Sequence, residues 1–280
     1  MSVVAIIVTY NPELSRFRYV LNQASKQANH VIIVDNDSKT KDVLKKLCNK
    51  TNNCDFVEIG FNSGVAHALR IGIKHSIKYN PDWLLFLDDD TVLLGNAIVK
   101  SLDLINSLPS IIKSKVGAVL LGSINGKCNI NVIDYGPFSG TLVKASIAER
   151  VCCRDDFFLD QADHDMDFNI RRLGYLVLGI NCRLINHKLG IKRWIPILSN
   201  MLHRSVSYEP PWRYYYIIRN STRLLIEGKM NVTFYTRQLI DSGIRIFFAD
   251  GPWALIKPLG LGVIHALLNE LGYVEPRVFT

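Results

Sequence analysis

The sequence predicts an α/β fold: a doubly wound, mostly parallel sheet followed by a helical extension at the C-terminus. Two observations carry this prediction. Short β-branched apolar runs alternate with amphipathic stretches up to about residue 121, and the pattern changes to longer apolar and basic stretches from about residue 200. The 280 residues are 48% apolar and 21% charged, which is typical of a globular protein and excludes a disordered or collagen-like chain.

The alternating pattern predicts each element of the sheet region in order. Strands are predicted over Val3–Val8, Val31–Val34, Phe56–Ile59, Trp83–Leu87 and Val116–Leu121. Helices are predicted between them, over Leu14–Lys26, Asp42–Cys48, Val65–Lys78 and Asn96–Leu108. Strands that alternate with helices imply parallel crossovers and a sheet covered on both faces.

The later part of the chain is predicted to be mainly helical. The expected helices are Phe168–Leu173, Tyr214–Glu227, Val232–Phe248 and Trp253–Leu271. Pro258 is expected to break the last of them, because proline removes a backbone donor and clashes with the preceding turn. We therefore expect two parts, residues 1–200 around the sheet and residues 201–280 as the helical region.

The N-terminal segment and the cysteines indicate the cellular compartment in which the protein is expected. The first apolar run has no basic segment and no small-residue cleavage site, so it is interpreted as a core strand rather than a signal peptide. No window offers the roughly 18 uninterrupted apolar residues of a spanning helix. The six cysteines lack paired CxxC spacing, which disfavours zinc and predicts free thiols in a reducing compartment. We expect a cytoplasmic protein, with peripheral attachment to the inner face of the cell membrane left open.

The charge balance argues against a nucleic-acid partner. The formal charge is +8, but the basic residues are scattered and form no recognised nucleic-acid motif. Near the C-terminus, Arg237, Arg245 and Lys257 alternate with Phe and Trp, a pattern that suits the interface of an anionic bilayer. The same apolar faces would also serve to pack on the rest of the protein or to form a homodimer, and both alternatives stay open.

Polar residues follow each of the first four predicted strands. They are Thr9-Tyr10-Asn11, Asp35-Asn36-Asp37-Ser38, Asn62-Ser63-Gly64 and Asp88-Asp89-Asp90-Thr91. In open α/β sheets ligands bind beyond the carboxyl ends of the strands. Loop solvation explains any one of these segments, but four in succession indicate a polar ligand along this edge.

Two acidic clusters are candidate centres of chemistry. Asp88 and Asp90 alternate with Asp89 in an extended segment, so they point the same way and can share a hard divalent cation. An acidic turn that caps the next helix is the alternative. The second cluster, Asp160 to Asp167, precedes the predicted helix Phe168–Leu173, and its apolar neighbours would raise a carboxyl pKa toward that of a useful base. An Asp-rich helix N-terminus is the alternative there.

These segments resemble the inverting family 2 glycosyltransferases with the GT-A fold, a Rossmann-like architecture, and most closely their rhamnosyltransferase-like branch. The segments that carry the resemblance are Ile7–Pro12, Val34–Asn36, Asn62–Ala66, Leu87–Thr91, Ser139–Gly140, Phe158–Tyr175, His187 and Tyr215–Leu225. Each segment is short, but their order and spacing over about Val3 to Glu227 are specific.

The resemblance implies roles for individual residues. The implied donor-binding residues are Thr9, Tyr10, Asn11, Asp35, Asn62, Gly64, Arg70, Asp88 and Asp89. The implied ligands of Mg²⁺ or Mn²⁺ are Asp88, Asp90 and His187. Asp163 matches the general base, with Asp165 beside it as the alternative. Ser139 and Gly140 are the implied acceptor contacts.

The resemblance also implies the reaction. The expected protein is a metal-dependent inverting glycosyltransferase that moves rhamnose from dTDP-rhamnose to a lipid-linked or surface-polysaccharide acceptor. Residues 1–200 would bind the nucleotide sugar and carry catalysis, and residues 201–280 would face the acceptor or the membrane. A UDP-sugar donor, for galactofuranosyl, hexosyl or N-acetylhexosaminyl transfer, is the alternative.

Two other classes of protein fit the sequence less well. A sugar-phosphate nucleotidyltransferase would carry a Gly-rich, Arg-containing loop after the first strand, and Thr9-Tyr10-Asn11-Pro12-Glu13 is not such a loop. An inactive binding subunit at the membrane surface would have no need of Asp90, Asp163 and His187 together.

Overall fold

The computed structural model describes residues 1–187 and 191–279. The chain divides into two compact units, the first formed by Met1–Arg154 with Met166–Lys188 and the second by Asp155–Asp165 with Leu189–Thr280. The expected functional division at residue 200 stays a prediction.

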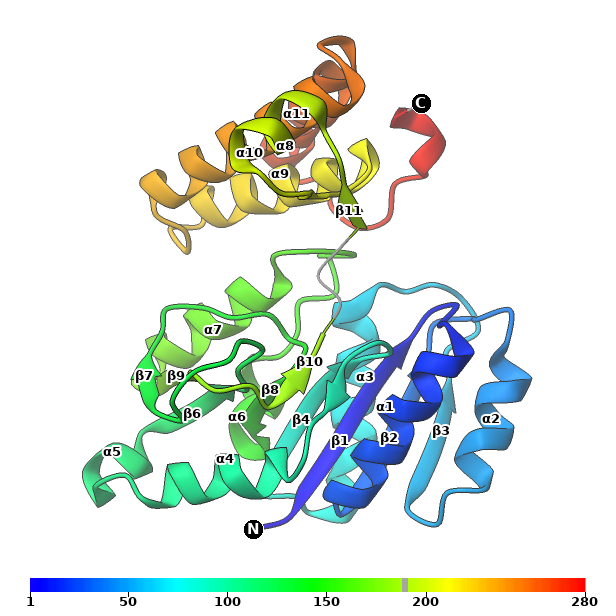
Figure 1. Cartoon of the computed structure of the whole chain (residues 1–280), viewed down its shortest axis with the longest axis vertical. Coiled ribbons are helices and arrows are strands. Elements are labelled where there is room, and N and C mark those ends of the chain that lie inside the picture. Colours follow the sequence, from blue (N-terminus) through cyan, green and yellow to red (C-terminus); the bar gives the residue numbers. More distant parts are fainter. Residues whose placement is uncertain (188–190, 280) are drawn as a thin grey trace. The chain divides into compact units, whose positions relative to one another are not determined.

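The first unit is built on an eight-stranded sheet in the order β3-β2-β1-β4-β8-β6-β9-β7 (Figure 1). Its strands are β1 (Val3–Thr9), β2 (His30–Asp35), β3 (Cys54–Glu58), β4 (Trp83–Asp88), β6 (Val116–Leu120), β7 (Ile130–Val132), β8 (Thr141–Lys144) and β9 (Leu176–Ile180). Strands β3, β2, β1 and β4 run parallel, whereas β8 is antiparallel to both of its neighbours. The predicted mostly parallel α/β sheet is confirmed.

Helices cover both faces of this sheet, which explains why every residue of β1 is buried. One face packs against α1 (Leu14–Gln27), α2 (Lys41–Asn49) and α4 (Ala97–Asn106). The other packs against α3 (Val65–Ser76) and α6 (Ala145–Val151). Short elements complete the unit: a 3₁₀ turn at Ile77–Tyr79, α5 (Ser110–Ser114), and the antiparallel pair β5 (Val92–Leu93) and β10 (Ile185–Asn186).

Helix α7 (Ala162–Arg172) begins earlier than predicted. The Asp-rich segment was expected before a helix starting at Phe168, but Asp163 and Asp165 lie in the first turn of α7. Carboxylates are favoured there because the free N–H groups of a helix N-terminus carry partial positive charge. The alternative of an Asp-rich helix start therefore describes the local structure.

The second unit contains three long helices, α9 (Pro211–Ile226), α10 (Val232–Asp250) and α11 (Trp253–Leu268). Smaller elements are β11 (Ile191–Arg193), which pairs antiparallel with β12 (Val206–Tyr208), α8 (Pro196–Leu202), and a 3₁₀ turn at Pro276–Phe279. Within residues 1–187 and 191–279, no helix has both the length and the apolar character needed to cross a membrane.

The expectation that Pro258 breaks the last helix is wrong, because α11 continues through it. Pro258, Gly262 and Ala266 follow one another at four-residue intervals and form the buried face of α11. A Cβ atom on Gly262 would lie 3.0 Å from Ile218 of α9, so the two helices approach closely along this small-residue face. Packing against α9 compensates for the one backbone hydrogen bond that proline cannot make.

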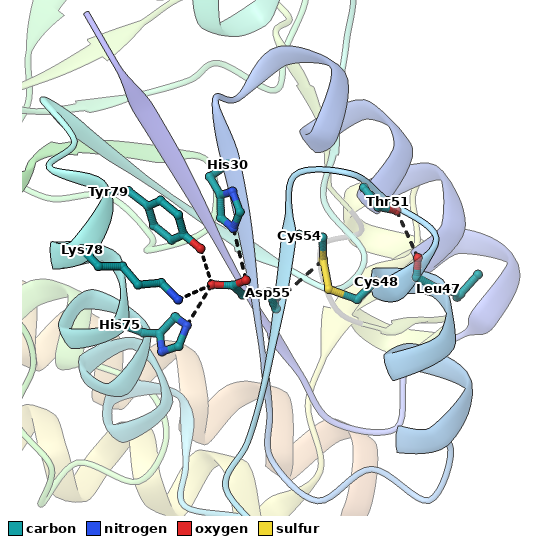
Figure 2. Close-up of a disulfide and its surroundings, with 9 residues drawn as sticks. All are labelled: His30, Leu47, Cys48, Thr51, Cys54, Asp55, His75, Lys78 and Tyr79. Carbon is teal, nitrogen blue, oxygen red and sulfur yellow. Dashed lines mark hydrogen bonds and ion pairs between the residues drawn. A yellow bond between two sulfur atoms is a disulfide. The ribbon is translucent and has the colours of Figure 1, made fainter.

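The predicted free thiols are also wrong. Cys48 is bonded to Cys54, Cys128 to Cys182, and Cys152 to Cys153, which leaves no free cysteine in the described chain. Figure 2 shows the first bond, which ties the end of α2 to the start of β3. The fold brings the Cα atoms of Cys48 and Cys54 to 5.3 Å, a proximity that sequence spacing does not reveal.

An ionic cluster next to this disulfide anchors the edge strand β3 (Figure 2). The Asp55 carboxylate accepts hydrogen bonds from Lys78 at 2.8 Å, from His75 at 2.9 Å and from Tyr79. Burial alone would raise the pKa of Asp55, but these three donors outweigh it and hold the pKa well below its ordinary value. Asp55 lies near the start of β3, at the edge of the sheet opposite the candidate site.

Candidate functional site

The register of the parallel strands brings the predicted polar residues to one edge of the sheet. Thr9 pairs with Asp35 across β1 and β2, and Val8 pairs with Asp88 across β1 and β4. The carboxyl ends of three strands therefore finish at the same level, as the strand-end pattern predicts.

The three predicted metal ligands lie together at this edge. Asp88, Asp90 and His187 each offer a ligand atom, and these atoms all lie within 4.8 Å of one another. Asp88 and Asp90 come from the end of β4, whereas His187 follows β10. Antiparallel pairing of Asn186 with Val92 brings His187 back beside the acidic loop. Two carboxylates and one imidazole are a donor set that suits Mg²⁺ or Mn²⁺.

Electrostatics couple the members of this cluster. His187 Nδ1 lies 3.3 Å from Asp90 Oδ1, and this contact raises the pKa of His187 above its ordinary value despite burial. Burial would raise the pKa of Asp90, but the hydrogen bond and charge of His187 outweigh it and lower that pKa. Asp90 is therefore held as a carboxylate, the form in which a carboxyl group can bind a cation.

Asp89 behaves differently from its two neighbours. Burial raises the pKa of Asp89 to about 7, although a hydrogen bond from the Tyr10 N–H at 3.2 Å acts to lower that pKa. The charges of Asp88, Asp90 and Asp35 raise it further. This crowding of like charges disfavours ionisation, and a bound cation would relieve it.

The loops after β1 and β2 are locked together. The buried Asp35 carboxylate accepts hydrogen bonds from the Thr9 hydroxyl at 2.7 Å and from the Ser38 N–H at 2.8 Å. The Asn11 N–H donates to the Ser38 hydroxyl, and the Asn11 side chain accepts from the Lys39 N–H, both at 2.9 Å. Asp35 thus shapes the loop from inside, and its contact with the donor base stays a prediction. The Tyr10 side chain is 52% exposed at the same edge.

Asn36 connects these loops to the start of α3. Its side-chain oxygen accepts from the Ser63 hydroxyl at 2.8 Å, and its amide donates to the Gly64 carbonyl at 3.2 Å. Gly64 adopts φ +84 before α3, a conformation that favours glycine, and its N–H donates to Asn62. Arg70 lies exposed further along α3.

Ser139 and Gly140, the predicted acceptor contacts, lie beneath the acidic loop. The buried Ser139 hydroxyl accepts from the Asp88 N–H at 2.8 Å and bonds to the Thr91 hydroxyl at 2.7 Å. The Gly140 N–H donates to the Phe86 carbonyl at 2.8 Å. Both residues support β4 and the acidic loop, while an acceptor contact stays a prediction.

Sequence reasoning missed Arg16, and it gave Thr91 no role of its own among the polar residues at the strand ends. The Arg16 Nε donates to the Asp90 carbonyl at 2.8 Å, and its Nη2 donates to the Asn186 carbonyl at 2.7 Å. Arg16 therefore joins the two segments that carry Asp90 and His187. The buried Thr91 hydroxyl also bonds to His187 Nδ1 and fixes the imidazole ring. A single arginine in an amphipathic helix carries no sequence signal for this role.

The two candidate bases belong to the second unit. Asp165 is 4% exposed and forms an ion pair with Lys229 at 2.6 Å. The Asp163 side chain is 25% exposed and accepts from the His164 N–H at 2.9 Å. Lys229 occupies the buried Asp165 carboxylate, whereas the more exposed Asp163 carboxylate is the more accessible of the two. The prediction that Asp163 and Asp90 act in one cleft stays untested, because they lie in different compact units.

Comparison with known sequences shows similarity to one family. Residues 4–117 match the family model described as glycosyl transferase family 2. Over 261 residues, the chain is 26% identical to the dTDP-rhamnosyl transferase RfbF of Shigella flexneri, covering 86% of each sequence. The chain is therefore similar to the family 2 glycosyltransferases over residues 4–117, and to this relative over most of its length.

Comparison with solved structures identifies the fold. The crystal structure of S. aureus TarS 1-349 matches with a TM-score of 0.58 and 12% identity, over 96% of this chain and 82% of the 1-349 chain. GalNAc-T7, solved with UDP, GalNAc and Mn²⁺, matches with a TM-score of 0.55 and 12% identity, over 92% of this chain and 59% of that one. The expected GT-A fold with its C-terminal helices is confirmed.

Proposed function

We propose that this glycosyltransferase is metal-dependent and inverting, and that it transfers rhamnose from dTDP-rhamnose to a lipid-linked or surface-polysaccharide acceptor. The observation that carries the proposal is the Asp88, Asp90 and His187 cluster at the carboxyl edge of the sheet. The similarity to a dTDP-rhamnosyl transferase supports the choice of donor.

The residues divide the reaction between them. Asp88, Asp90 and His187 would hold Mg²⁺ or Mn²⁺, which as a Lewis acid stabilises the negative charge that develops on the leaving diphosphate. Asp163 takes the proton of the acceptor hydroxyl. At the same time the hydroxyl oxygen bonds to the anomeric carbon of the sugar, and the bond between that carbon and the diphosphate breaks. One displacement from the face opposite the leaving group inverts the anomeric configuration.

The role of Asp163 is tested by replacing it with its amide. Asp163→Asn should keep the wild-type Kd for the nucleotide sugar and lose transfer by about 10²-fold or more, because general-base catalysis contributes about 10²–10⁴-fold. Asp165→Asn is the matched comparison, and it should lower stability through its lost pair with Lys229 more than it lowers kcat. Full turnover by Asp163→Asn would remove Asp163 from the base role.

The donor is tested by thermal unfolding with a panel of nucleotide sugars. dTDP-rhamnose, UDP-galactofuranose, UDP-glucose and UDP-N-acetylglucosamine are each added with and without Mn²⁺. The true donor at 100 times its Kd should stabilise the protein by about 2.7 kcal/mol. Stabilisation by a UDP-sugar alone would replace the rhamnose proposal, and equal stabilisation without Mn²⁺ would contradict the metal site.

We also propose that the C-terminal helices attach the protein to the membrane that holds a lipid-linked acceptor. The face of α11 opposite its packed side exposes Trp253, Ile256, Ile264 and Leu267, with Trp253 82% exposed. Lys257 is the only charged residue among Asp, Glu, Lys and Arg in this helix. An exposed apolar stripe with Trp and Lys suits the headgroup region of an anionic bilayer.

The membrane proposal is tested by vesicle flotation. The protein should float with vesicles containing anionic lipid at low salt, and Trp253→Ser with Ile256→Ser should abolish flotation. Ile111→Ser is the control, because Ile111 is 77% exposed in the first unit. If the protein ignores anionic vesicles and instead forms a dimer that the same two substitutions dissociate, a second copy covers the stripe and the proposal is wrong.

A further inference from the structure

The backbone just before Asp163 has an unusual conformation. Asp160 and Gln161 are consecutive non-glycine residues with φ of +59 and +66. Such left-handed residues cost energy, because their Cβ atoms crowd the backbone, and they persist only where neighbouring groups hold them. This turn leads directly into α7, so its conformation sets where the first turn of α7 presents Asp163.

One face of α9 holds this turn. The buried Asn220 amide donates to two successive carbonyls, those of Leu159 at 2.7 Å and Asp160 at 3.0 Å. The Arg213 guanidinium binds the Asp160 carboxylate through Nε and Nη2, both at 3.2 Å. Arg213 and Asn220 are seven residues apart, which places them on the same side of the helix. Main chain and side chain of the turn are therefore held from one helix.

Arg219 fixes the orientation of the Asn220 amide. Its Nε donates to Asn220 Oδ1 at 3.0 Å, which leaves Nδ2 facing the two carbonyls. Arg219 is fully buried, lies over the rings of Tyr215 and Tyr216, and donates to the Gly272 carbonyl at 2.8 Å. The arrangement around Asn220 is thus set by packing within the second unit.

We infer that Asn220 and Arg213 are positioning residues for the general base: they hold the left-handed turn at Asp160 and Gln161 and so fix the place of Asp163. The inference rests on the proposed role of Asp163. Neither residue takes part in proton transfer itself.

The test replaces Asn220 with an isosteric residue that cannot donate. Asn220→Asp keeps the acceptor for Arg219 but places carboxylate oxygens against the two carbonyls. We expect kcat to fall about 10- to 100-fold, the scale of a catalytic group displaced by about 1 Å. The Kd for the nucleotide sugar, bound in the first unit, should stay within about twofold of wild type.

A rescue separates positioning from general damage. Glycine adopts left-handed conformations without steric cost, so Gln161→Gly should restore part of the lost kcat in the Asn220→Asp background. An unchanged kcat in folded Asn220→Asp, or no rescue by Gln161→Gly, would overturn the inference.

A second pair of variants covers the case in which Asn220→Asp does not fold. Arg213→Lys keeps the charge but loses the two-pronged hold on Asp160 and should lower kcat several-fold. Arg223→Lys is the matched control on α9, since Arg223 pairs with Glu227 at 2.8 Å. Equal effects of the two substitutions would overturn the inference. Failure of the proposed base is a distinct result: Asp163→Asn would then turn over normally, whatever Asn220 does.

Discussion

Arg16 offers a direct test of how the proposed metal site is held. Its guanidinium joins the Asp90 carbonyl to the Asn186 carbonyl, and thus links the two segments that supply the candidate ligands. Removing the positive charge of Arg16 would favour binding of a nearby cation. Removing its hydrogen bonds would disfavour that binding, because the two segments that carry the candidate ligands would be held less firmly. Arg16→Lys separates the two effects, because lysine keeps the charge but lacks the fork that reaches both carbonyls.

The expected magnitude follows from the two lost hydrogen bonds. At about 0.5–1.5 kcal/mol each they contribute about 1–3 kcal/mol. Since 1.4 kcal/mol corresponds to tenfold in affinity, the Kd for Mn²⁺ should rise about 5- to 140-fold. This range agrees with the roughly 10- to 100-fold effect of groups that orient metal ligands in other proteins.

Titration of Mn²⁺ by electron paramagnetic resonance measures this Kd directly and needs no turnover. Arg18→Lys is the control, because Arg18 lies exposed two residues further along α1. A wild-type Kd for Arg16→Lys, or an equal loss in Arg18→Lys, would show that Arg16 does not hold the site.

Three further predictions concern stability. Asp55→Asn should lower the free energy of unfolding at pH 7. This loss should shrink as the pH falls below the ordinary pKa of 3.8, because a carboxyl group whose folded-state pKa is lowered stops stabilising the fold once it is protonated. Urea unfolding at pH 7 and pH 3 measures the difference, and an equal loss at both pH values would contradict the prediction. Cys48→Ser should cost about 2 kcal/mol in urea unfolding under oxidising conditions and nothing once wild type is reduced. Gly140→Ala should cost about 1–3 kcal/mol, because Gly140 has φ +85 and its Cβ would lie 2.6 Å from Ile185. Gly95→Ala, which meets nothing within 4 Å, should cost less, and equal shifts in thermal unfolding would contradict the packing argument.

Much of the arrangement at the carboxyl edge of the sheet was predictable, because it depends on local sequence pattern. Continuous apolar runs define buried strands, and in a parallel sheet their carboxyl ends share one edge. Asp88 and Asp90 were predicted to face the same way from alternation along an extended segment, and both lie in the ligand cluster with His187. The arrival of His187 depends on pairing between β10 and β5, which no local pattern specifies.

The local pattern of the acidic segment at the start of α7 was not enough to predict its structure. The pattern of Asp residues fitted both a catalytic cluster and a helix start, and Asp163 with Asp165 lies in the first helical turn. What distinguishes the two carboxylates is Lys229, which is far along the chain and forms an ion pair with Asp165. Pro258 likewise signalled a helix end, but packing on α9 outweighed one missing hydrogen bond.

The sequence by itself determined the class of fold, the strand ends that gather polar residues, and the resemblance to the family 2 glycosyltransferases, because these follow from periodicity and from motifs along the chain. Only the tertiary structure decided which cysteines pair, which residues support the acidic loop, and what holds the turn before Asp163. Those contacts join residues that are distant in sequence, such as Arg16 with Asn186 and Asn220 with Leu159. Side chains that meet only after the elements pack leave no periodic trace in the chain, so their roles emerge from packing alone.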